Sequence, residues 1–241
     1  MLRKKAFCLL MTVSAFFGLM ACHAQRPAES AAHEQQDSSA SLGTSIHLKR
    51  IAEFNEPWAL AVLPDGRLLI TERSGQLILF NPIDQTKTLI RNIPKVAYGG
   101  QGGLGDIVLH PEFAQNHQIY LSYAEAGQGG YGAVVIRADL NLDQAQPQLD
   151  NLKMIWKQAP KVRGQGHYAH RMLFDGAGKL WISSGERQKF DPAQDLTSNL
   201  GKMIRLNDDG SVALDNPFQT QGDIAKQIWS LGHRNPLGMA L

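Results

Sequence analysis

From about residue 47 onward the chain consists of short apolar runs, rich in aliphatic and β-branched residues, which are separated by Gly, Pro, Asn and Asp. No long stretch places apolar residues at the 3.6-residue period of an amphipathic helix. Short apolar runs between turn-forming residues are typical of β-strands. The pattern therefore predicts an all-β domain over residues 47–241.

One combination of strand, turn and strand recurs along the chain. It appears as 58-WALAVLPDGRLLITERSGQLILF-80, 103-GLGDIVLHPEFAQNHQIYLSYAE-125 and 171-RMLFDGAGKLWISSGE-186, and its beginning returns as an expected strand in 234-RNPLGMAL-241. Pro64-Asp65-Gly66 predicts a tight turn, because proline presets φ and glycine accepts a positive φ. Strand hairpins that repeat at intervals of about 45 to 65 residues are typical of β-propeller blades.

The number of repeats predicts an incomplete ring. About 195 residues follow residue 46, which is enough for about three to four blades, whereas propellers close with roughly four to eight. The last repeat breaks off within an apolar run at Leu241. We therefore expect an N-terminal fragment of a propeller, insoluble or inactive when expressed alone, because unpaired strand edges and uncovered sheet faces promote aggregation.

The N-terminus, MLRKKAFCLLMTVSAFFGLMAC, has a basic start followed by an apolar stretch of roughly 16 residues. This pattern predicts a signal peptide over residues 1–21. Leu19-Met20-Ala21-Cys22 resembles the lipobox of bacterial lipoproteins, in which the cysteine becomes the acylated N-terminus. We expect an exported, periplasmic protein that Cys22 anchors to the outer membrane, and no other contact with a membrane.

Residues 22–46 are rich in Ala, Ser, Gln and acids and contain almost no large apolar residue, so they are expected to form a flexible polar tether. Both cysteines, Cys8 and Cys22, precede the β-rich part, which therefore has no disulfide available. Removing residues 1–21 deletes three basic residues and no acid, which leaves 24 − 3 = 21 basic against 22 acidic residues. A nearly neutral domain gives no support for nucleic-acid binding.

Four stretches carry a resemblance to a known family: 99-GGQGGLGDIVLHPEF-113, 166-GHYAHRMLFDGAGKLWISSGE-186, 193-AQDLTSNLGKMIRLNDDGSV-212 and 228-IWSLGHRNPLGMAL-241. Together they resemble the soluble aldose sugar dehydrogenases that use pyrroloquinoline quinone, within the glucose/sorbosone dehydrogenase family of six-bladed β-propellers. The resemblance implies an enzyme that oxidises the C1 hydroxyl of aldose sugars to lactones. It also implies calcium as a second cofactor and an electron acceptor of unknown identity.

The resemblance implies roles for individual residues. His167 matches the catalytic base of the family, and Gln101 matches a residue that lines the pocket for cofactor and substrate. A neutral imidazole suits the base because its ordinary pKa is about 6.5. A base of this kind contributes about 10²- to 10⁴-fold to the rate.

Further site residues follow from the same matches. Arg234 and Asn235 match the pair that contacts the quinone, and Arg187 and Gln188 match a loop that borders the sugar. The calcium ligands of the family are expected beyond residue 241, so no metal ligand is expected within this chain. Glu186 is expected to cap or pair locally and is not counted among the catalytic residues.

The chain also departs from the family pattern. Members usually have small residues between the histidine and the arginine, whereas this chain has Tyr168-Ala169-His170, and a bulky His170 either narrows the pocket or faces away. Gly166 stands where the glucose-specific relatives have an aspartate.

His167 and His170, three residues apart, also raise the alternatives of a metal site and of a structural role. An extended backbone would send the two rings to opposite faces, so that they could not bind one metal ion together. At the level of function, the alternatives are a lactone-hydrolysing propeller and a non-catalytic sugar-binding propeller.

Overall fold

The computed structural model describes residues 48–240. The predicted signal peptide, Cys22 and the predicted tether lie outside this range. Residues Lys49–Leu241 form one compact unit, and a second unit, Met1–Leu48, falls almost wholly outside the described residues. The domain boundaries read from the sequence therefore stay predictions.

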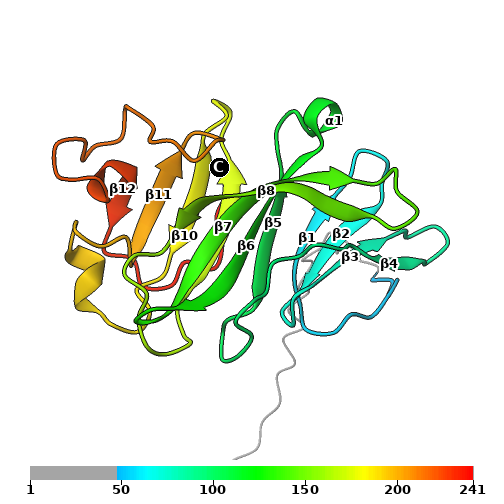
Figure 1. Ribbon diagram of the computed structural model, residues 1–241, viewed down its shortest axis with the longest axis horizontal. Coiled ribbons are helices and arrows are strands. Elements are labelled where there is room, and N and C mark those ends of the chain that lie inside the picture. The colour runs from blue at the N-terminus through cyan, green and yellow to red at the C-terminus, as the bar shows by residue number, and fades with distance from the viewer. Residues whose placement is uncertain (1–47, 241) are drawn as a thin grey trace, which may run out of the picture. The chain divides into compact units, whose positions relative to one another are not determined.

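Within residues 48–240 the strands form three antiparallel sheets of four strands each, which follow one another along the chain (Figure 1). The first sheet contains β1 (Pro57–Val62), β2 (Leu68–Glu72), β3 (Gln76–Phe80) and β4 (Lys87–Leu89). The second contains β5 (Leu104–Leu109), β6 (Gln118–Gly127), β7 (Gly130–Asn141) and β8 (Gln148–Lys157). The third contains β9 (Ala169–Phe174), β10 (Leu180–Ser184), β11 (Lys202–Leu206) and β12 (Ile228–Leu231).

Helical structure is confined to the connections in the described range: α1 (Phe113–Asn116), η1 (Asp191–Gln194) and η2 (Ala225–Gln227). None of the helices in this range is long and apolar enough to cross a lipid bilayer. The all-β prediction is confirmed, and the three sheets form a partial β-propeller.

The predicted turns explain how the hairpins close. After β1, Leu63 N–H donates to the Arg67 carbonyl at 2.8 Å and Gly66 N–H donates to the Leu63 carbonyl at 2.9 Å. Gly66 has φ of 85°, a conformation that glycine adopts at little cost. The prediction of a tight turn at Pro64-Asp65-Gly66 is confirmed.

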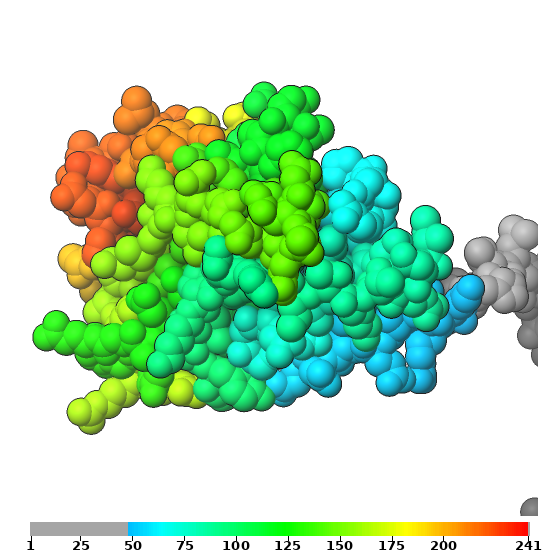
Figure 2. Space-filling model, turned by 45° about the vertical axis from the view of Figure 1, so that its right-hand side comes forward, coloured from blue at the N-terminus to red at the C-terminus, as the bar shows by residue number. Residues whose placement is uncertain are grey.

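The second sheet is buried on both faces. Its residues alternate between two cores, since successive side chains of a strand point to opposite faces. Leu121 and Ile136 pack toward the first sheet in one hydrophobic cluster, whereas Tyr120 and Val135 pack toward the third sheet in another. The innermost strands contact one another in the order β1, β5, β9, and the sheets lie side by side in chain order in the space-filling view (Figure 2).

A buried carboxylate joins the second sheet to the third. Asp106, on β5, accepts a hydrogen bond from Met172 N–H at 2.7 Å and forms an ion pair with Arg171 at 3.1 Å. Burial raises the pKa of Asp106, although the bond from Met172 and the charge of Arg171 oppose the rise. The side chain therefore fixes the position of β9 relative to β5 at one point.

The expected strand at residues 234–241 is wrong for the residues that the structure describes, because residues 232–240 belong to no strand. The polar groups of this segment bind instead to the third sheet and its loops. Ser183 Oγ donates to the Pro236 carbonyl at 2.9 Å, and Arg171 Nε donates to the Leu237 carbonyl at 2.9 Å. Side-chain bonds to the carbonyls of Pro236 and Leu237 thus take the place of a strand ladder.

We expect Asp106→Ala to lower the free energy of unfolding by about 2 to 4 kcal/mol, because it leaves Met172 N–H and Arg171 Nη1 without their partner. Urea unfolding of the complete protein that contains this chain measures the change. The matched control is Asp223→Ala, whose side chain is 97% exposed and pairs only with Lys226, and which should leave the unfolding midpoint unchanged. Equal effects of the two substitutions would contradict the role assigned to Asp106.

Candidate functional site

His167 and Gln101 lie together, although 65 residues separate them in the chain. His167 belongs to the connection between β8 and β9 and has φ of 48°, and Gln101 belongs to the connection between β4 and β5. His167 N–H donates to Gln101 Oε1 at 2.7 Å, and Gln101 N–H donates to the Gln165 carbonyl at 2.7 Å. Two loops that carry predicted site residues are thus bound to each other.

Glu186 is the site residue that sequence reasoning missed. It lies two residues after the end of β10, is 2% exposed, and bonds to His167 Nδ1 through Oε1. Its other oxygen accepts the backbone N–H groups of Lys189 and Phe190, the latter at 2.6 Å. The expectation of local pairing is correct for Lys189 and Phe190, but the carboxylate also holds the predicted base.

Glu186 is ionised in this setting. Burial acts to raise its pKa, but the hydrogen bonds from the Phe190 backbone and the His167 ring outweigh burial and hold the pKa below its ordinary value of 4.5. An ionised carboxylate only accepts hydrogen bonds, so His167 Nδ1 must carry the proton of this contact.

With the proton on Nδ1, the neutral form of the His167 ring has its lone pair on Nε2. No residue in the described range bonds to this atom, and 12% of the side chain remains exposed. A neutral imidazole that is oriented by a carboxylate and open at Nε2 is suited to take a proton from a bound hydroxyl group.

Arg187 lies below the surface and is 1% exposed. Its guanidinium donates to the carbonyls of Gly166 at 2.8 Å, Tyr131 at 2.6 Å and Gly164 at 2.6 Å, and it stacks over the Tyr168 ring at 3.6 Å. Arg187 therefore clamps the loop that carries His167. Its contact with a sugar stays a prediction.

Gln188 is exposed and has φ of 59°. Its side chain lies against Gly166, where an added Cβ would meet the Gln188 carboxamide carbon at 2.5 Å. The glycine that stands in place of the aspartate of glucose-specific relatives thus gives room for Gln188. The role of Gln188 in substrate binding also stays a prediction.

Arg234 and Asn235 cross the same end of the third sheet. The Arg234 carbonyl accepts Glu186 N–H at 2.8 Å, and Asn235 Oδ1 accepts Ala169 N–H at 3.0 Å. Within the described range, the exposed Arg234 guanidinium and the Asn235 Nδ2 amide have no hydrogen-bond partner. A free cation beside a free amide donor fits an anionic cofactor rich in oxygen acceptors.

A cavity of about 270 Å³ borders this group of residues. Its lining comes from β1, the β2–β3 turn, the β4–β5 connection, the start of β9 with the residue before it, and the segment after β12: Trp58, Arg73, Gly100, Gln101, Tyr168, Ala169, His170 and Leu237. His170 therefore does not face away from the pocket. The rings of His167 and His170 have separate partners, Glu186 and Ser122, and in residues 48–240 no group of three or more His, Cys, Asp or Glu side chains is arranged to hold a metal ion.

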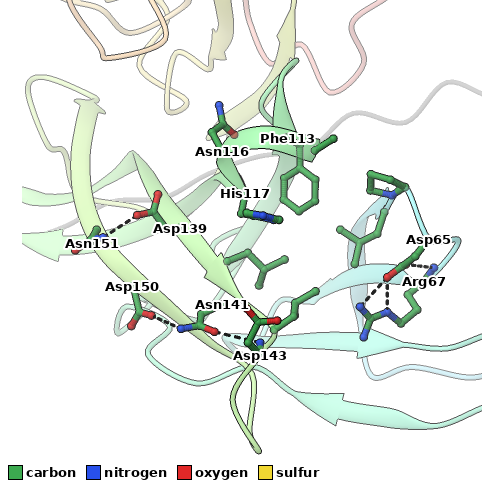
Figure 3. Close-up of a pocket in the computed structure, with 15 residues that line it drawn as sticks. Asp65, Arg67, Phe113, Asn116, His117, Asp139, Asn141, Asp143, Asp150 and Asn151 are labelled. Atoms are coloured by element: carbon green, nitrogen blue, oxygen red, sulfur yellow. Dashed lines mark hydrogen bonds and ion pairs between the residues drawn. The ribbon is translucent and has the colours of Figure 1, made fainter.

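A larger cavity, of about 650 Å³, lies at the other ends of the strands (Figure 3). It is lined by the β1–β2 turn, α1 and the β7–β8 connection, and its polar side chains pair with one another. Asn151 donates to Asp139 at 2.7 Å, and Asn141 donates to Asp150 at 3.0 Å. None of the site residues predicted from the sequence lines this cavity.

Comparison with known proteins matches residues 54–241 to the model of the glucose/sorbosone dehydrogenase family. The aldose sugar dehydrogenase of Escherichia coli strain K12 is 38% identical over 190 residues, which cover 78% of this chain and 51% of the relative. The chain thus spans about half the length of this curated relative.

Two solved structures share the fold. The apo form of the soluble aldose sugar dehydrogenase from Escherichia coli has a TM-score of 0.74 at 40% identity, covering 77% of this chain and 54% of the other. The pyrroloquinoline-quinone-bound form of aldose sugar dehydrogenase from Streptomyces coelicolor has a TM-score of 0.69 at 29% identity, with coverage of 78% and 54%.

We expect Glu186→Gln to remove a pH-dependent part of the stability. The folded pKa of Glu186 lies below its ordinary value of 4.5, so the unfolded chain binds more protons between these two values. The stabilisation from Glu186 is therefore complete above about pH 4.5 and is lost as the pH falls through the folded pKa. Urea unfolding of wild type and variant between about pH 3 and 6 measures this difference.

The exposed Glu112, substituted by Gln, is the control for this measurement. The difference between wild type and Glu186→Gln should grow as the pH rises toward 4.5 and stay constant above it. A difference that is the same at all these pH values would show that folding does not shift the pKa of Glu186, and a difference that shrinks as the pH rises would show that folding raises this pKa.

Proposed function

This chain belongs to the glucose/sorbosone dehydrogenase family, and we propose that the complete protein oxidises the C1 hydroxyl of aldose sugars to lactones with pyrroloquinoline quinone as its cofactor. The observation that carries the proposal is the contact between His167 Nδ1 and Glu186, which leaves His167 Nε2 without a partner in the described range, while Gln101 binds the His167 backbone N–H. The residues that match the quinone-binding pair lie at the same end of the third sheet.

His167 acts as the general base in this proposal. Removing a hydride from C1 requires the C1 hydroxyl to lose its proton, and His167 Nε2 accepts that proton. The ionised Glu186 stabilises the imidazolium that forms and keeps the ring in the required tautomer. Gln101 fixes the backbone of His167 through its Oε1, which leaves the Gln101 amide donor for the sugar.

Arg234 and Asn235 are the residues of this chain that would hold pyrroloquinoline quinone. Their free donors suit its carboxylate and carbonyl oxygens, and the Arg234 charge favours electron density that grows on the bound ring. When bound, the quinone supplies the site that accepts the hydride. Calcium belongs to the proposal as well, with its ligands expected beyond residue 241.

The proposed partners are an aldose and an electron acceptor of unknown identity. Gln188 contacts the sugar in this proposal, which its exposure supports; it lies two residues after Glu186 in the connection between β10 and β11. Arg187 contributes by holding the carbonyls of Gly164 and Gly166. We assign the substrate class, and not one particular sugar, to these residues.

We expect His167→Ala to lower kcat for aldose oxidation by about 10²- to 10⁴-fold, because the variant lacks the base. Aldose-dependent reduction of an artificial dye, by the complete reading frame that contains this chain loaded with pyrroloquinoline quinone and calcium, measures the effect. His117→Ala is the matched control, because His117 is exposed at the opposite ends of the strands and lines the larger cavity.

The outcomes separate the parts of the proposal. Turnover that requires the quinone, collapses in His167→Ala and persists in His117→Ala supports the reaction and its base. Uptake of the quinone without oxidation of any aldose would support the proposed cofactor and contradict the proposed substrate class. Full turnover by His167→Ala would favour a different base.

We further propose that the protein is exported to the periplasm and anchored to the outer membrane through a lipid on Cys22. The support is the signal-like N-terminus with its lipobox. Mass spectrometry of the protein purified from membranes should find Cys22 as the N-terminal residue, with a mass increase from its acyl chains. Cys22→Ser should abolish this modification, and an unmodified mature N-terminus at any other residue would disprove the lipid anchor.

A further inference from the structure

His170 is a polar residue of the cavity that the proposed mechanism does not use. It is 2% exposed, lies at the start of β9, and lines the 270 Å³ cavity together with Gln101 and Trp58. Gln101 also binds the backbone of the base, His167. His170 therefore shares a cavity with the residue that binds the backbone of the proposed base.

The neighbours of His170 hold its ring in one orientation. The ring stacks on Trp58 with a centroid distance of 5.1 Å and an interplanar angle of 10°. On another side it lies so close to Gly105 that an added Cβ would meet His170 Cε1 at 1.9 Å. Trp58 is fixed in turn, because Arg171 covers it with a guanidinium-to-ring distance of 4.4 Å.

Hydrogen bonding to Ser122 determines the tautomer of His170. Ser122 Oγ accepts Asp106 N–H at 2.8 Å and donates to the His170 carbonyl at 2.9 Å. The single hydroxyl proton is therefore used, so the 2.7 Å contact with His170 Nδ1 requires that Nδ1 carries a hydrogen. Nε2 consequently has a lone pair, and no residue in the described range bonds to it.

The ring remains neutral. Burial, together with the nearby charges of Arg171 and Arg187, lowers the pKa of His170 to about 3. His170 Nε2 is therefore a hydrogen-bond acceptor at neutral pH. Because His170 lines the cavity, this acceptor can take a hydrogen bond from a ligand that brings a hydroxyl donor into the cavity.

We infer that His170 is a specificity-determining residue, whose Nε2 accepts a hydrogen bond from a hydroxyl group of the aldose other than the C1 hydroxyl. The inference rests on the proposed function, in which the C1 hydroxyl belongs to His167. A neutral acceptor beside the stacked Trp58 selects a sugar with a hydroxyl at one ring position and discriminates against an isomer that lacks it there.

Two substitutions separate the acceptor from the rest of the ring. His170→Asn keeps an amide donor near the position of Nδ1, where it reaches Ser122, but has no atom at the position of Nε2. His170→Gln is one bond longer and places an amide oxygen near the position of Nε2. His117→Ala serves as a control, because His117 lies at the other ends of the strands.

The dissociation constants of the preferred aldose and of its monodeoxy analogues, one for each hydroxyl other than that on C1, are measured by calorimetry on the complete protein. His170→Asn should weaken the affinity for the parent sugar roughly tenfold, which corresponds to one lost hydrogen bond. It should leave unchanged the affinity of the one deoxy analogue that lacks the contacted hydroxyl. His170→Gln should restore affinity for the parent sugar to within about threefold of wild type.

A purely structural role gives a different result. If His170→Asn weakens the parent sugar and every deoxy analogue by the same factor, no substrate hydroxyl contacts Nε2 and the inference is overturned. The same holds if no affinity changes at all. Calorimetry detects binding without turnover. If the protein binds aldoses and oxidises none, the proposed reaction is contradicted but the role of His170 is still tested. If the protein binds no aldose, both the proposed reaction and the role of His170 are contradicted.

Discussion

The buried guanidinium of Arg187 is the interaction on which the arrangement of the site depends. A cation that is 1% exposed is tolerated only if its donors are satisfied, because removal of the charge from water is costly. Three carbonyl oxygens and the face of Tyr168 supply this compensation. Two of the carbonyls belong to the loop before β9, and the third belongs to β7. Because the buried guanidinium of Arg187 needs these carbonyl oxygens as partners, it holds the backbone around His167 in place.

The same turn carries a buried charge of the opposite sign. Glu186 precedes Arg187 directly, and the chain then passes through the left-handed region at Arg187 and Gln188, each with φ of 59°. Such conformations are unfavourable for residues other than glycine, and they persist where the surroundings fix them. The carboxylate of Glu186, which binds the backbone of Lys189 and Phe190, is one such constraint. Local strain and the orientation of His167 are thus coupled through one carboxylate.

The sequence predicted the blades better than the contacts between them. Alternating apolar runs and the turn at Pro64-Asp65-Gly66 are local signals, and both reappear in the structure. Glu186 was missed because its partner lies 19 residues away in another connection, and its only local signal is a carboxylate two residues after a buried strand. The expected strand at residues 234–241 failed because a strand needs a neighbour to pair with, which an apolar run alone does not reveal.

The site takes its residues from connections of different sheets, so its geometry depends on the register between the innermost strands. Gln101 precedes β5 and His167 precedes β9, and both loops lie at the ends where these strands begin. Thr71 Oγ1 donates to the Gly105 carbonyl at 2.6 Å, and Asp106 binds Met172 N–H at 2.7 Å. These bonds fix β2 to β5 and β5 to β9. A change that lets neighbouring sheets slide would therefore separate Gln101 from His167 without altering either residue. The alignment of the site thus depends on the same contacts that stabilise the sheets against one another.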